Sequence, residues 1–386
     1  MQFRNKILFM STIVVASFLY VDLTLAAQTN VTSNLLLNLG MLYDSNFYYD
    51  PVDERGVTTY LVQPGIGFGL ETGKTEIAFS YTLDANYYDE SGEDDFYGHT
   101  ALFLGNYEIS DRLSFDLSDN FNKTRDSAEL DPLGNIATRE EYYRNRLGTI
   151  FTLDFKPKFT TKIGYQNWIT DYNEDTSEDS MGNQGIYDLI YYLNSSTSLD
   201  LEYHYWDVDY DGDISDYTSN QLSLVTRKEF RILALEAAIG YQKREFDDAA
   251  HGDIDVVPYR FTIRGKSSSG KTRFSLSAAQ NFNFLNSNDD EGDYYEANRY
   301  SLSLFRDLTA KITLGIDGYY QNSDYIDYIR DDDTYKILGN INYQIRERLA
   351  FYFSVSYENR DSNLADNEYE NVVTMGQLQF SHNIAK

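Results

Sequence analysis

Strict alternation of apolar and polar residues is the feature that most constrains this chain, and it recurs from about residue 30 to the C-terminus. In residues 113–121, for example, Leu113, Phe115, Leu117 and Phe121 are separated by Ser, Asp and Asn residues. A period of two residues places neighbouring side chains on opposite sides of a β-strand, whereas a helix repeats every three to four residues. The alternating segments run for roughly 9–14 residues, a length that suits tilted strands crossing a membrane. The chain is therefore predicted to be all-β, with one apolar and one polar face on each strand.

The connections between these segments alternate between short and long. Short turns are expected at the following positions: Thr72-Gly73, Asp111-Arg112, Pro157, Asn194-Ser195, Glu229-Phe230, Ser268-Ser269, Asp307-Leu308 and Glu347. Longer acidic loops are expected at 89–96, 125–140, 172–184, 246–253, 286–293, 324–332 and 361–368. These eight turns join sixteen strands, and one strand at each end (about 33–45 and 369–384) gives about eighteen. We therefore expect a single closed antiparallel transmembrane β-barrel, with short periplasmic turns and longer acidic extracellular loops, rather than a soluble sandwich.

Aromatic residues cluster at the loop-proximal ends of the predicted strands. The sequence has 35 Tyr and 23 Phe but only 2 Trp. Aromatic pairs fall at Tyr48-Tyr49, Tyr87-Tyr88, Phe96-Tyr97, Tyr142-Tyr143, Tyr294-Tyr295 and Tyr319-Tyr320. Tyrosine has an apolar ring and a polar hydroxyl, which suits the boundary between hydrocarbon and headgroups. High strand propensity explains the presence of tyrosine but not its clustering, so the pattern predicts an aromatic girdle.

The N-terminus differs from the rest of the chain. Arg4 and Lys6 precede an apolar stretch at 7–20, and small residues follow at 24–27. This order is typical of a secretory signal peptide, and the apolar stretch is shorter than the roughly 20 residues of a membrane-spanning anchor helix. We predict a signal peptide over residues 1–26 and one outer-membrane barrel over residues 27–386. The absence of Cys fits passage through an oxidising compartment.

Charged residues of both signs fall on the predicted polar faces, which in such a barrel line the lumen. The candidate lumen-lining residues are Arg144, Arg146, Lys162, Trp168, Glu202, His204, Trp206, Arg260 and Arg264. Mixed charges can form ladders of wall salt bridges or a selectivity filter. Trp168, Trp206 and His204, among acids and amides, suit either a carbohydrate track or ordinary packing of the wall. A barrel of this size leaves an aqueous channel unless something fills it, and no segment is long enough to form a plug domain.

One acidic segment has the opening pattern of a calcium-binding loop. The candidate ligands are Asp207, Asp209, Asp211 and Asp213, with Gly212 at the position of the sharp turn. Thr218 stands where the bidentate Glu of an EF-hand belongs, and Asp211-Gly212 is also an ordinary hairpin turn. The segment therefore fits either Ca²⁺ binding in an extracellular loop or a solvated turn. No cofactor is expected to be required, and no nucleic-acid partner is expected for a chain with a net charge of −29.

Two segments resemble a known family, the β-barrel porins found in exopolysaccharide and exosortase-associated gene clusters of Gram-negative bacteria. They are Gly40-Met41-Leu42-Tyr43-Asp44-Ser45-Asn46 and Leu61-Val62-Gln63-Pro64-Gly65-Ile66-Gly67. The resemblance implies an outer-membrane pore through which a secreted polysaccharide leaves the cell. It also implies polysaccharide and periplasmic export components as partners, beside outer-membrane lipid, lipopolysaccharide and the β-barrel assembly machinery.

Three classes of function fit these features. The first is a pore for polysaccharide export, the second is a diffusion porin for sugars or ions, and the third is a barrel whose loops act in surface adhesion. Enzymatic activity is not expected, because no serine motif stands beside the four histidines, His99, His204, His251 and His382.

Overall fold

The computed structural model describes residues 29–89, 94–125, 140–155, 157–173, 178–212, 215–247, 252–284, 294–325 and 329–385. The predicted signal peptide lies outside these residues, as do most of loop 125–140 and all of loop 286–293. Within the described ranges, no helix is long and apolar enough to cross a membrane.

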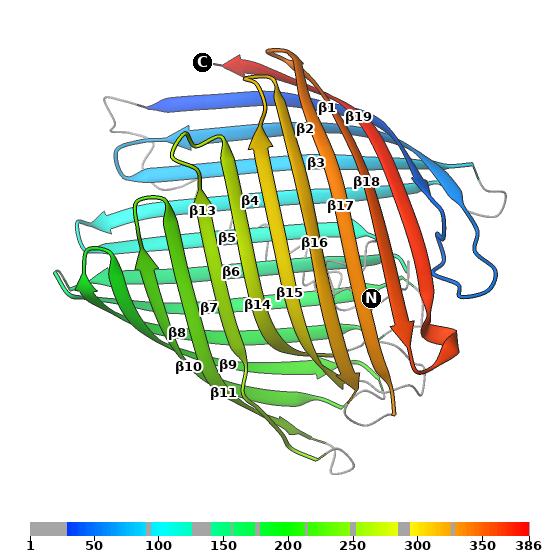
Figure 1. The fold of residues 1–386 in the computed structure, drawn as a ribbon. Helices are drawn as coiled ribbons and strands as arrows, with labels where there is room; N and C mark the ends of the chain where they lie inside the picture. Colours follow the sequence, from blue (N-terminus) through cyan, green and yellow to red (C-terminus); the bar gives the residue numbers. More distant parts are fainter. Residues whose placement is uncertain are drawn as a thin grey trace.

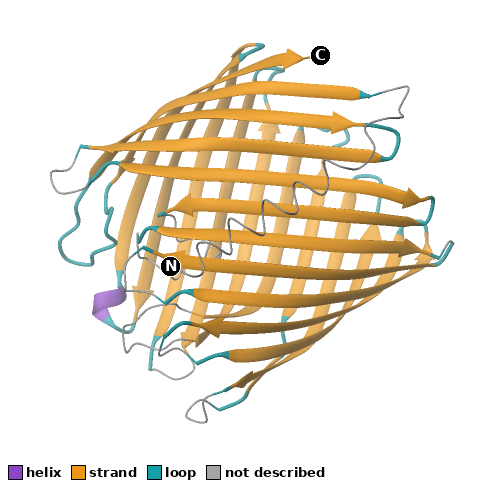
Figure 2. Cartoon of the chain, turned by 180° about the vertical axis from the view of Figure 1, so that it is seen from behind, coloured by secondary structure: helices purple, strands orange, loops and turns teal. Residues whose placement is uncertain are grey.

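The described chain is almost entirely β-strand (Figures 1 and 2). The first half contains β1 (Asn30–Asp44), β2 (Val57–Glu71), β3 (Thr75–Tyr88), β4 (Phe96–Ser110), β5 (Leu113–Thr124), β6 (Tyr142–Asp154), β7 (Phe159–Tyr172), β8 (Ser180–Asn194) and β9 (Thr197–Tyr210). The second half contains β10 (Tyr217–Glu229), β11 (Leu233–Phe246), β12 (Ile254–Val256), β13 (Tyr259–Lys266), β14 (Thr272–Phe284), β15 (Tyr294–Asp307), β16 (Ile312–Tyr325), β17 (Asp331–Arg346), β18 (Leu349–Ser362) and β19 (Tyr369–Ala385). One 3-10 helix, η2 (Ala365–Asn367), lies in the loop before β19.

The sheet closes on itself because β1 pairs with both β2 and β19. Every pairing is antiparallel, and each strand pairs with its neighbours in the sequence. β12 and β13 both pair with β11 and are separated only by Val257 and Pro258, so they form one barrel strand in two parts. Counting them as one reduces the nineteen strands of the sheet to eighteen. The predicted closed eighteen-strand antiparallel barrel is confirmed.

The short turns lie where the sequence predicts them, between β2 and β3, β4 and β5, and so on to β17 and β18. The predicted bounds of loop 172–184 are wrong, because β8 begins at Ser180 and pairs with β7 from there on. Ser180–Gln184 contains no run of alternating apolar residues, so the local sequence pattern does not predict a strand there. The segment forms a strand because its backbone pairs with β7. Asp207–Tyr210, expected in a loop, likewise belongs to β9.

Each strand has an outer and an inner face, distinguished by chemistry and exposure. On β9 the outer face carries Leu201, Tyr203 and Tyr205, which are 40–42 % exposed although apolar or aromatic. The inner face carries Asp200 and Glu202 at alternating positions. Apolar side chains pointing away from the barrel are stable only against lipid, so the outer face is the lipid face and the inner face lines the lumen.

Tyrosines on the outer face form a recurring diagonal contact. In five of the hairpins, a tyrosine hydroxyl bonds to a polar side chain of the next strand that lies two residues nearer the long loops. The pairs are Tyr81–His99, Tyr165–Asn183, Tyr203–Asn220, Tyr241–Asp255 and Tyr320–Asp333, with oxygen-to-partner distances of 2.6–2.7 Å. This belt marks the loop-side limit of the apolar band, since each ring faces lipid and each hydroxyl reaches a polar partner.

The loop between β1 and β2 is held by Asn46, which is fully buried. Its Nδ2 donates to the carbonyls of Asp50 (2.9 Å) and Glu370 (3.1 Å), and its Oδ1 accepts from the N–H of Asp50 (2.9 Å). Asn46 thereby ties the loop to β19. Part of the segment that carries the family resemblance thus stabilises the place where the barrel closes.

The orientation of the barrel gives a direct test. Epitope tags inserted in the loop at 363–368 are expected to bind antibody on intact cells, because this loop belongs to the long-loop rim. Tags at Asn194-Ser195 or Ser268-Ser269 should bind only after permeabilisation, because these turns belong to the periplasmic rim. Labelling of the turns on intact cells would show that the barrel is inverted.

Candidate channel lining

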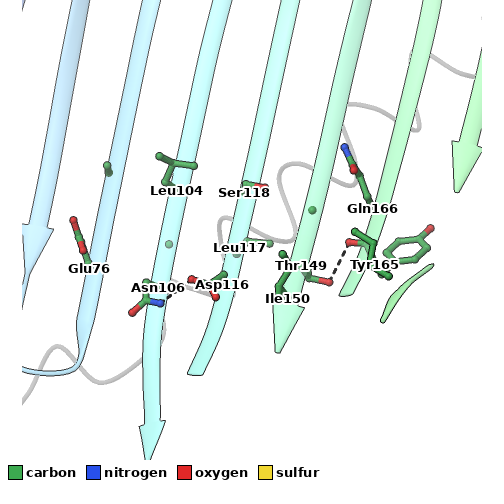
Figure 3. Close-up of a pocket in the computed structure, with 14 residues that line it drawn as sticks. Glu76, Leu104, Asn106, Asp116, Leu117, Ser118, Thr149, Ile150, Tyr165 and Gln166 are labelled. Carbon is green, nitrogen blue, oxygen red and sulfur yellow. Dashed lines mark hydrogen bonds between the residues drawn. The ribbon is translucent and has the colours of Figure 1, made fainter. Parts of the chain in front are cut away.

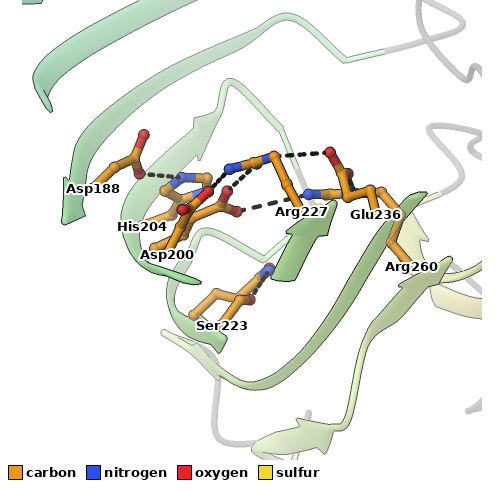
Figure 4. Close-up of polar contacts among 9 residues, drawn as sticks. Asp188, Asp200, His204, Ser223, Arg227, Glu236 and Arg260 are labelled. Carbon is orange, nitrogen blue, oxygen red and sulfur yellow. Dashed lines mark hydrogen bonds and ion pairs between the residues drawn. The ribbon is translucent and has the colours of Figure 1, made fainter. Parts of the chain in front are cut away.

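An ion-pair network centred on Arg227 lies on the inner face of β9–β13 (Figure 4). Arg227 Nη2 donates to Glu202 (2.9 Å), Nε donates to Glu236 (3.0 Å), and Nη1 pairs with Asp200. Arg260 extends the network, since its Nε donates to Glu236 at 2.7 Å. Register explains the contacts: Arg227 lies directly opposite Glu236, while Asp200 and Glu202 lie opposite Val225 and Ser223 on the other side. One guanidinium on β10 therefore links acids of the two neighbouring strands, β9 and β11.

The network contains more carboxylates than arginine side chains. His204 Nε2 lies 3.8 Å from Asp188, which adds a fourth carboxylate to Asp200, Glu202 and Glu236. Two arginines thus face four carboxylates. Asp200 is 1 % exposed, whereas the Arg227 and Arg260 side chains are 37 % and 46 % exposed. The carboxylates therefore support the guanidinium groups from behind, and the guanidinium groups face the water of the lumen.

A second set of polar contacts lies on the inner face of β17–β19. Lys336 Nζ is 2.6 Å from Glu358, and the hydroxyl of Tyr369 donates to the same carboxylate at 2.9 Å. The guanidinium of Arg360 lies 4.8 Å from the centre of the Tyr369 ring. Charged side chains on these strands are therefore held by polar partners, as they are in the network around Arg227.

A hollow with a volume of about 430 Å³ lies on the inner wall between β3 and β8 (Figure 3). Its polar lining includes Glu76 and Asp116, and Asp116 accepts a hydrogen bond from Asn106 at 2.7 Å. Leu104 and Ile150 supply apolar surface beside them. Gly148 leaves the hollow open, because a Cβ there would meet the Ser118 hydroxyl at 2.9 Å.

The candidate lining residues all occupy inner-face positions of their strands. Arg144 and Arg146 are on β6, Lys162 and Trp168 on β7, Glu202, His204 and Trp206 on β9, and Arg260 and Arg264 on β13. The structure brings Glu202, His204 and Arg260 together around Arg227. It does not bring Arg144, Arg146 or Arg264 into that network.

The indole ring of Trp168 packs over the backbone of the neighbouring strand β8 at Gly182. Trp168 lies opposite Gly182, and a Cβ at Gly182 would overlap the indole ring. Trp206 lies opposite Gln184, two residues further along the same strand. β8 thus separates two aromatic rings on the inner face, with amides between them.

Four members of the network are absent from the candidate lining residues given above: Asp188, Asp200, Arg227 and Glu236. Each of them is a polar residue at an inner-face position of the alternating pattern, and this pattern predicts that it faces the lumen. Arg227 shares its face with Ser223 and alternates with the outward Leu222 and Leu224, which are 49 % and 52 % exposed. Their assembly into one cluster, however, depends on how four strands are paired.

The proposed calcium ligands do not form a complete set among the described residues. Asp207 and Asp209 lie on the outer face near the loop end of β9, Asp211 follows the strand, and Asp213 is outside the described residues. Within the described part of the chain, no group of three or more His, Asp or Glu residues could hold a metal ion. Calcium binding by this segment stays a prediction.

The histidines are dispersed. His99 is on the outer face and bonds to Tyr81, His204 is in the network, His382 is on β19, and His251 lies outside the described residues.

A closed barrel with an apolar outer face and a charged lumen defines an outer-membrane porin, so the protein lies in the outer membrane.

Comparison with known families agrees with this class. Residues 225–382, which run from β10 to β19, match the family described as "Putative beta-barrel porin 2". The matched part, less than half of the chain, is similar to a family of β-barrel porins, in line with the resemblance noted in the sequence. No curated protein matches the chain.

Solved structures show the same fold at low sequence identity. Pseudomonas aeruginosa OccK2 (OpdF) is 12 % identical, with a TM-score of 0.56 over 92 % of this chain and 99 % of that one. OccK2 in complex with glucuronate is 10 % identical, with a TM-score of 0.55 over 92 % and 98 %. P. aeruginosa OpdK with vanillate is 10 % identical, with a TM-score of 0.52 over 92 % and 99 %. Outer-membrane channels therefore share this architecture.

Proposed function

We propose that this porin is a passive diffusion channel for small polar and charged solutes. The observation that carries the proposal is the inner wall itself, in which Arg227 and Arg260 are held by buried or half-buried carboxylates and still face the lumen. Guanidinium groups held in this way can bind passing anions without reorganising. An eighteen-strand barrel is also wide enough for an aqueous path.

The ligands named for the structural neighbours support the same solute class. Vanillate and glucuronate are small molecules with one carboxylate each. The likeness to those channels concerns the fold alone, so it suggests the size range of solutes and identifies no substrate for this chain.

Export of a polysaccharide, which the family resemblance implies, is a second candidate. The observation in its favour is the pair of inner-face tryptophans beside β8, because flat aromatic rings stack on sugar rings. The comparisons add no support for export. Adhesion by the loops has no specific observation in its favour.

Liposome swelling separates these functions. Purified protein in liposomes is expected to admit glucose and glucuronate and to exclude oligosaccharides of increasing length. An Arg227→Gln/Arg260→Gln variant should slow glucuronate severalfold relative to glucose, because the exposed guanidinium groups are lost. If no small solute entered at all, the diffusion channel would be ruled out. Loss of secreted polysaccharide on deletion of the gene would instead support export.

A further inference from the structure

A chain of hydrogen-bonded amides crosses the inner face of the barrel where the sheet closes between β19 and β1. Gln379 Nε2 donates to Gln377 Oε1 at 2.8 Å, and Gln377 Nε2 donates to Gln63 Oε1 at 2.8 Å. Asn38 Nδ2 donates to the same Gln63 oxygen at 3.4 Å, and Gln63 Nε2 donates to Asp84 at 2.7 Å. This chain, the amide track, therefore runs over β19, β1, β2 and β3 and ends on one carboxylate.

The register of the strands explains how the amide track forms. Asn38 of β1 lies directly opposite Gln379 on one side and Gln63 on the other. Gln377 lies opposite Gly40, and a Cβ at Gly40 would be only 3.3 Å from the Gln377 side chain. Because β1 has no side chain at this position, the amide of Gln377 can reach across β1 to Gln63.

The amides of the track keep hydrogen-bonding capacity for a further partner. A side-chain amide has two N–H donors and one carbonyl acceptor, and the bonds within the track use one donor of each glutamine. Gln379, Asn38 and Gln63 are half-buried, so part of each amide is open to the lumen. A sugar hydroxyl both donates and accepts hydrogen bonds, so a row of neighbouring amides matches a row of hydroxyl groups.

An aromatic ring lies beside the amide track. Tyr352 of β18 is half-buried and lies directly opposite Gln377 and Asn342. Its neighbours on the inner face of β18 are Ala350 and Ser354, which have short side chains. Among the described residues, the Tyr352 ring and the Asn342 amide have no hydrogen-bonded or stacked partner. Tyr352 therefore offers apolar ring surface to a ligand, and the amides on either side offer hydrogen bonds.

The surroundings of the amide track are uncharged apart from Asp84. Two rows of paired inner-face positions run from β17 to β2 through the track. The first row is Gln344, Ala350, Gln379, Asn38 and Gln63, and the second is Asn342, Tyr352, Gln377, Gly40 and Leu61. None of these residues is charged, and the ion pair of Lys336 and Glu358 lies nearer the long loops. The track therefore suits a neutral ligand that forms hydrogen bonds.

We propose that the amide track and Tyr352 form a binding site for a short neutral saccharide inside the lumen. The inference rests on the proposed function as a diffusion channel, because the saccharide must enter the lumen to reach the site. Neighbouring strands are about 4.8 Å apart, so the four steps from β18 to β3 span about 19 Å. A site of this length contacts two linked sugar rings more fully than one ring, and the site therefore favours a disaccharide over a monosaccharide.

Titration of maltose into the channel in a planar bilayer tests the proposal. A bound sugar obstructs the passage of ions, so the conductance of the unmodified protein should fall and then saturate as maltose is added. The half-saturating concentration should be lower for maltose than for glucose. Because the ligand is neutral, this concentration should be the same at low and high KCl, unlike that of a site that binds through charge.

Replacing glutamine by leucine removes the hydrogen bonds and keeps most of the side-chain volume. Gln377→Leu/Gln379→Leu should raise the half-saturating maltose concentration about five- to twentyfold, and Tyr352→Leu should raise it about three- to tenfold. Gln221→Leu is the matched control and should leave it unchanged, because Gln221 is on the inner face of β10, nine strands away from β1 in a ring of eighteen.

A role of the amides in closing the sheet alone predicts a different result. Gln377→Leu/Gln379→Leu would then unfold at a lower denaturant concentration and keep the maltose response of the unmodified protein. Asn342→Leu separates the two roles, because the Asn342 amide bonds to no described residue and so does not fasten one strand to another. This variant should weaken maltose binding about threefold and leave the midpoint of unfolding unchanged.

The outcomes distinguish the binding site from the proposed function. An unchanged half-saturating concentration in the folded track variants would overturn the site while ion conduction continues. An equal effect of Gln221→Leu would also overturn it, because the loss would not be local. A protein that forms no conducting channel would instead overturn the proposed diffusion function. Heat-modifiable electrophoretic mobility reports whether each variant has folded, and Asn342→Leu serves if the double variant does not.

Discussion

Replacing Leu302 by arginine is expected to destabilise the barrel by about 2–4 kcal/mol, because it places a charge in the middle of the lipid face. Leu302 is 46 % exposed between Tyr300 and Leu304 on the outer face of β15, and it lies opposite Leu276 and Gly318. No acid on these neighbouring positions can compensate the charge. The free energy of unfolding, measured by denaturant titration in lipid vesicles, gives the cost directly.

Ser303→Arg is the matched control, one residue further along the same strand. Ser303 faces the lumen and lies opposite Asp317, so an arginine there reaches water and an acid. We expect a change well below that of Leu302→Arg. Equal destabilisation by the two variants would mean that the assignment of inner and outer faces is wrong.

Replacing Arg227 by methionine is expected to have the second large effect. The variant keeps most of the side-chain volume but leaves Asp200, Glu202 and Glu236 without their shared cation. Because Asp200 is almost fully buried while Arg227 is partly exposed to the lumen, we expect a loss of about 1–3 kcal/mol. The same variant should make the channel more cation-selective in a planar bilayer, since one positive charge disappears beside four carboxylates.

A second substitution separates the ion pair from simple packing. Asp200→Asn in the Arg227→Met background should restore part of the stability, because it removes the buried charge that has lost its partner. A double variant no more stable than Arg227→Met would show that the network contributes little to stability.

The strand character and the two-faced chemistry of this barrel could be read from local sequence. Alternation specifies which residues share a face, and the positions of the short turns specify where each strand reverses, because both depend on residues close together in the chain. For that reason the number of strands and the inner-face positions of Arg260 and Glu202 were predictable.

The contacts between side chains of different strands could not be predicted without the tertiary structure. Ser180–Gln184 forms a strand because its backbone pairs with β7, and the side chains of this segment do not predict that pairing. Arg227 meets Asp200 and Glu236 because β10 lies between β9 and β11 in one particular register.

The opposition of β1–β5 and β10–β15 across the lumen is the clearest example of what the tertiary structure alone decides. The sequence shows that β1–β5 contain no arginine and a single lysine, Lys123, and it also shows the arginines of β10–β15. That these segments face each other depends on closure between β1 and β19, which fixes the circumference at eighteen strands. The sequence by itself determined which charged residues each group of strands carries, and closure of the sheet decided which strands those residues face, because opposition across a lumen is a property of the whole ring.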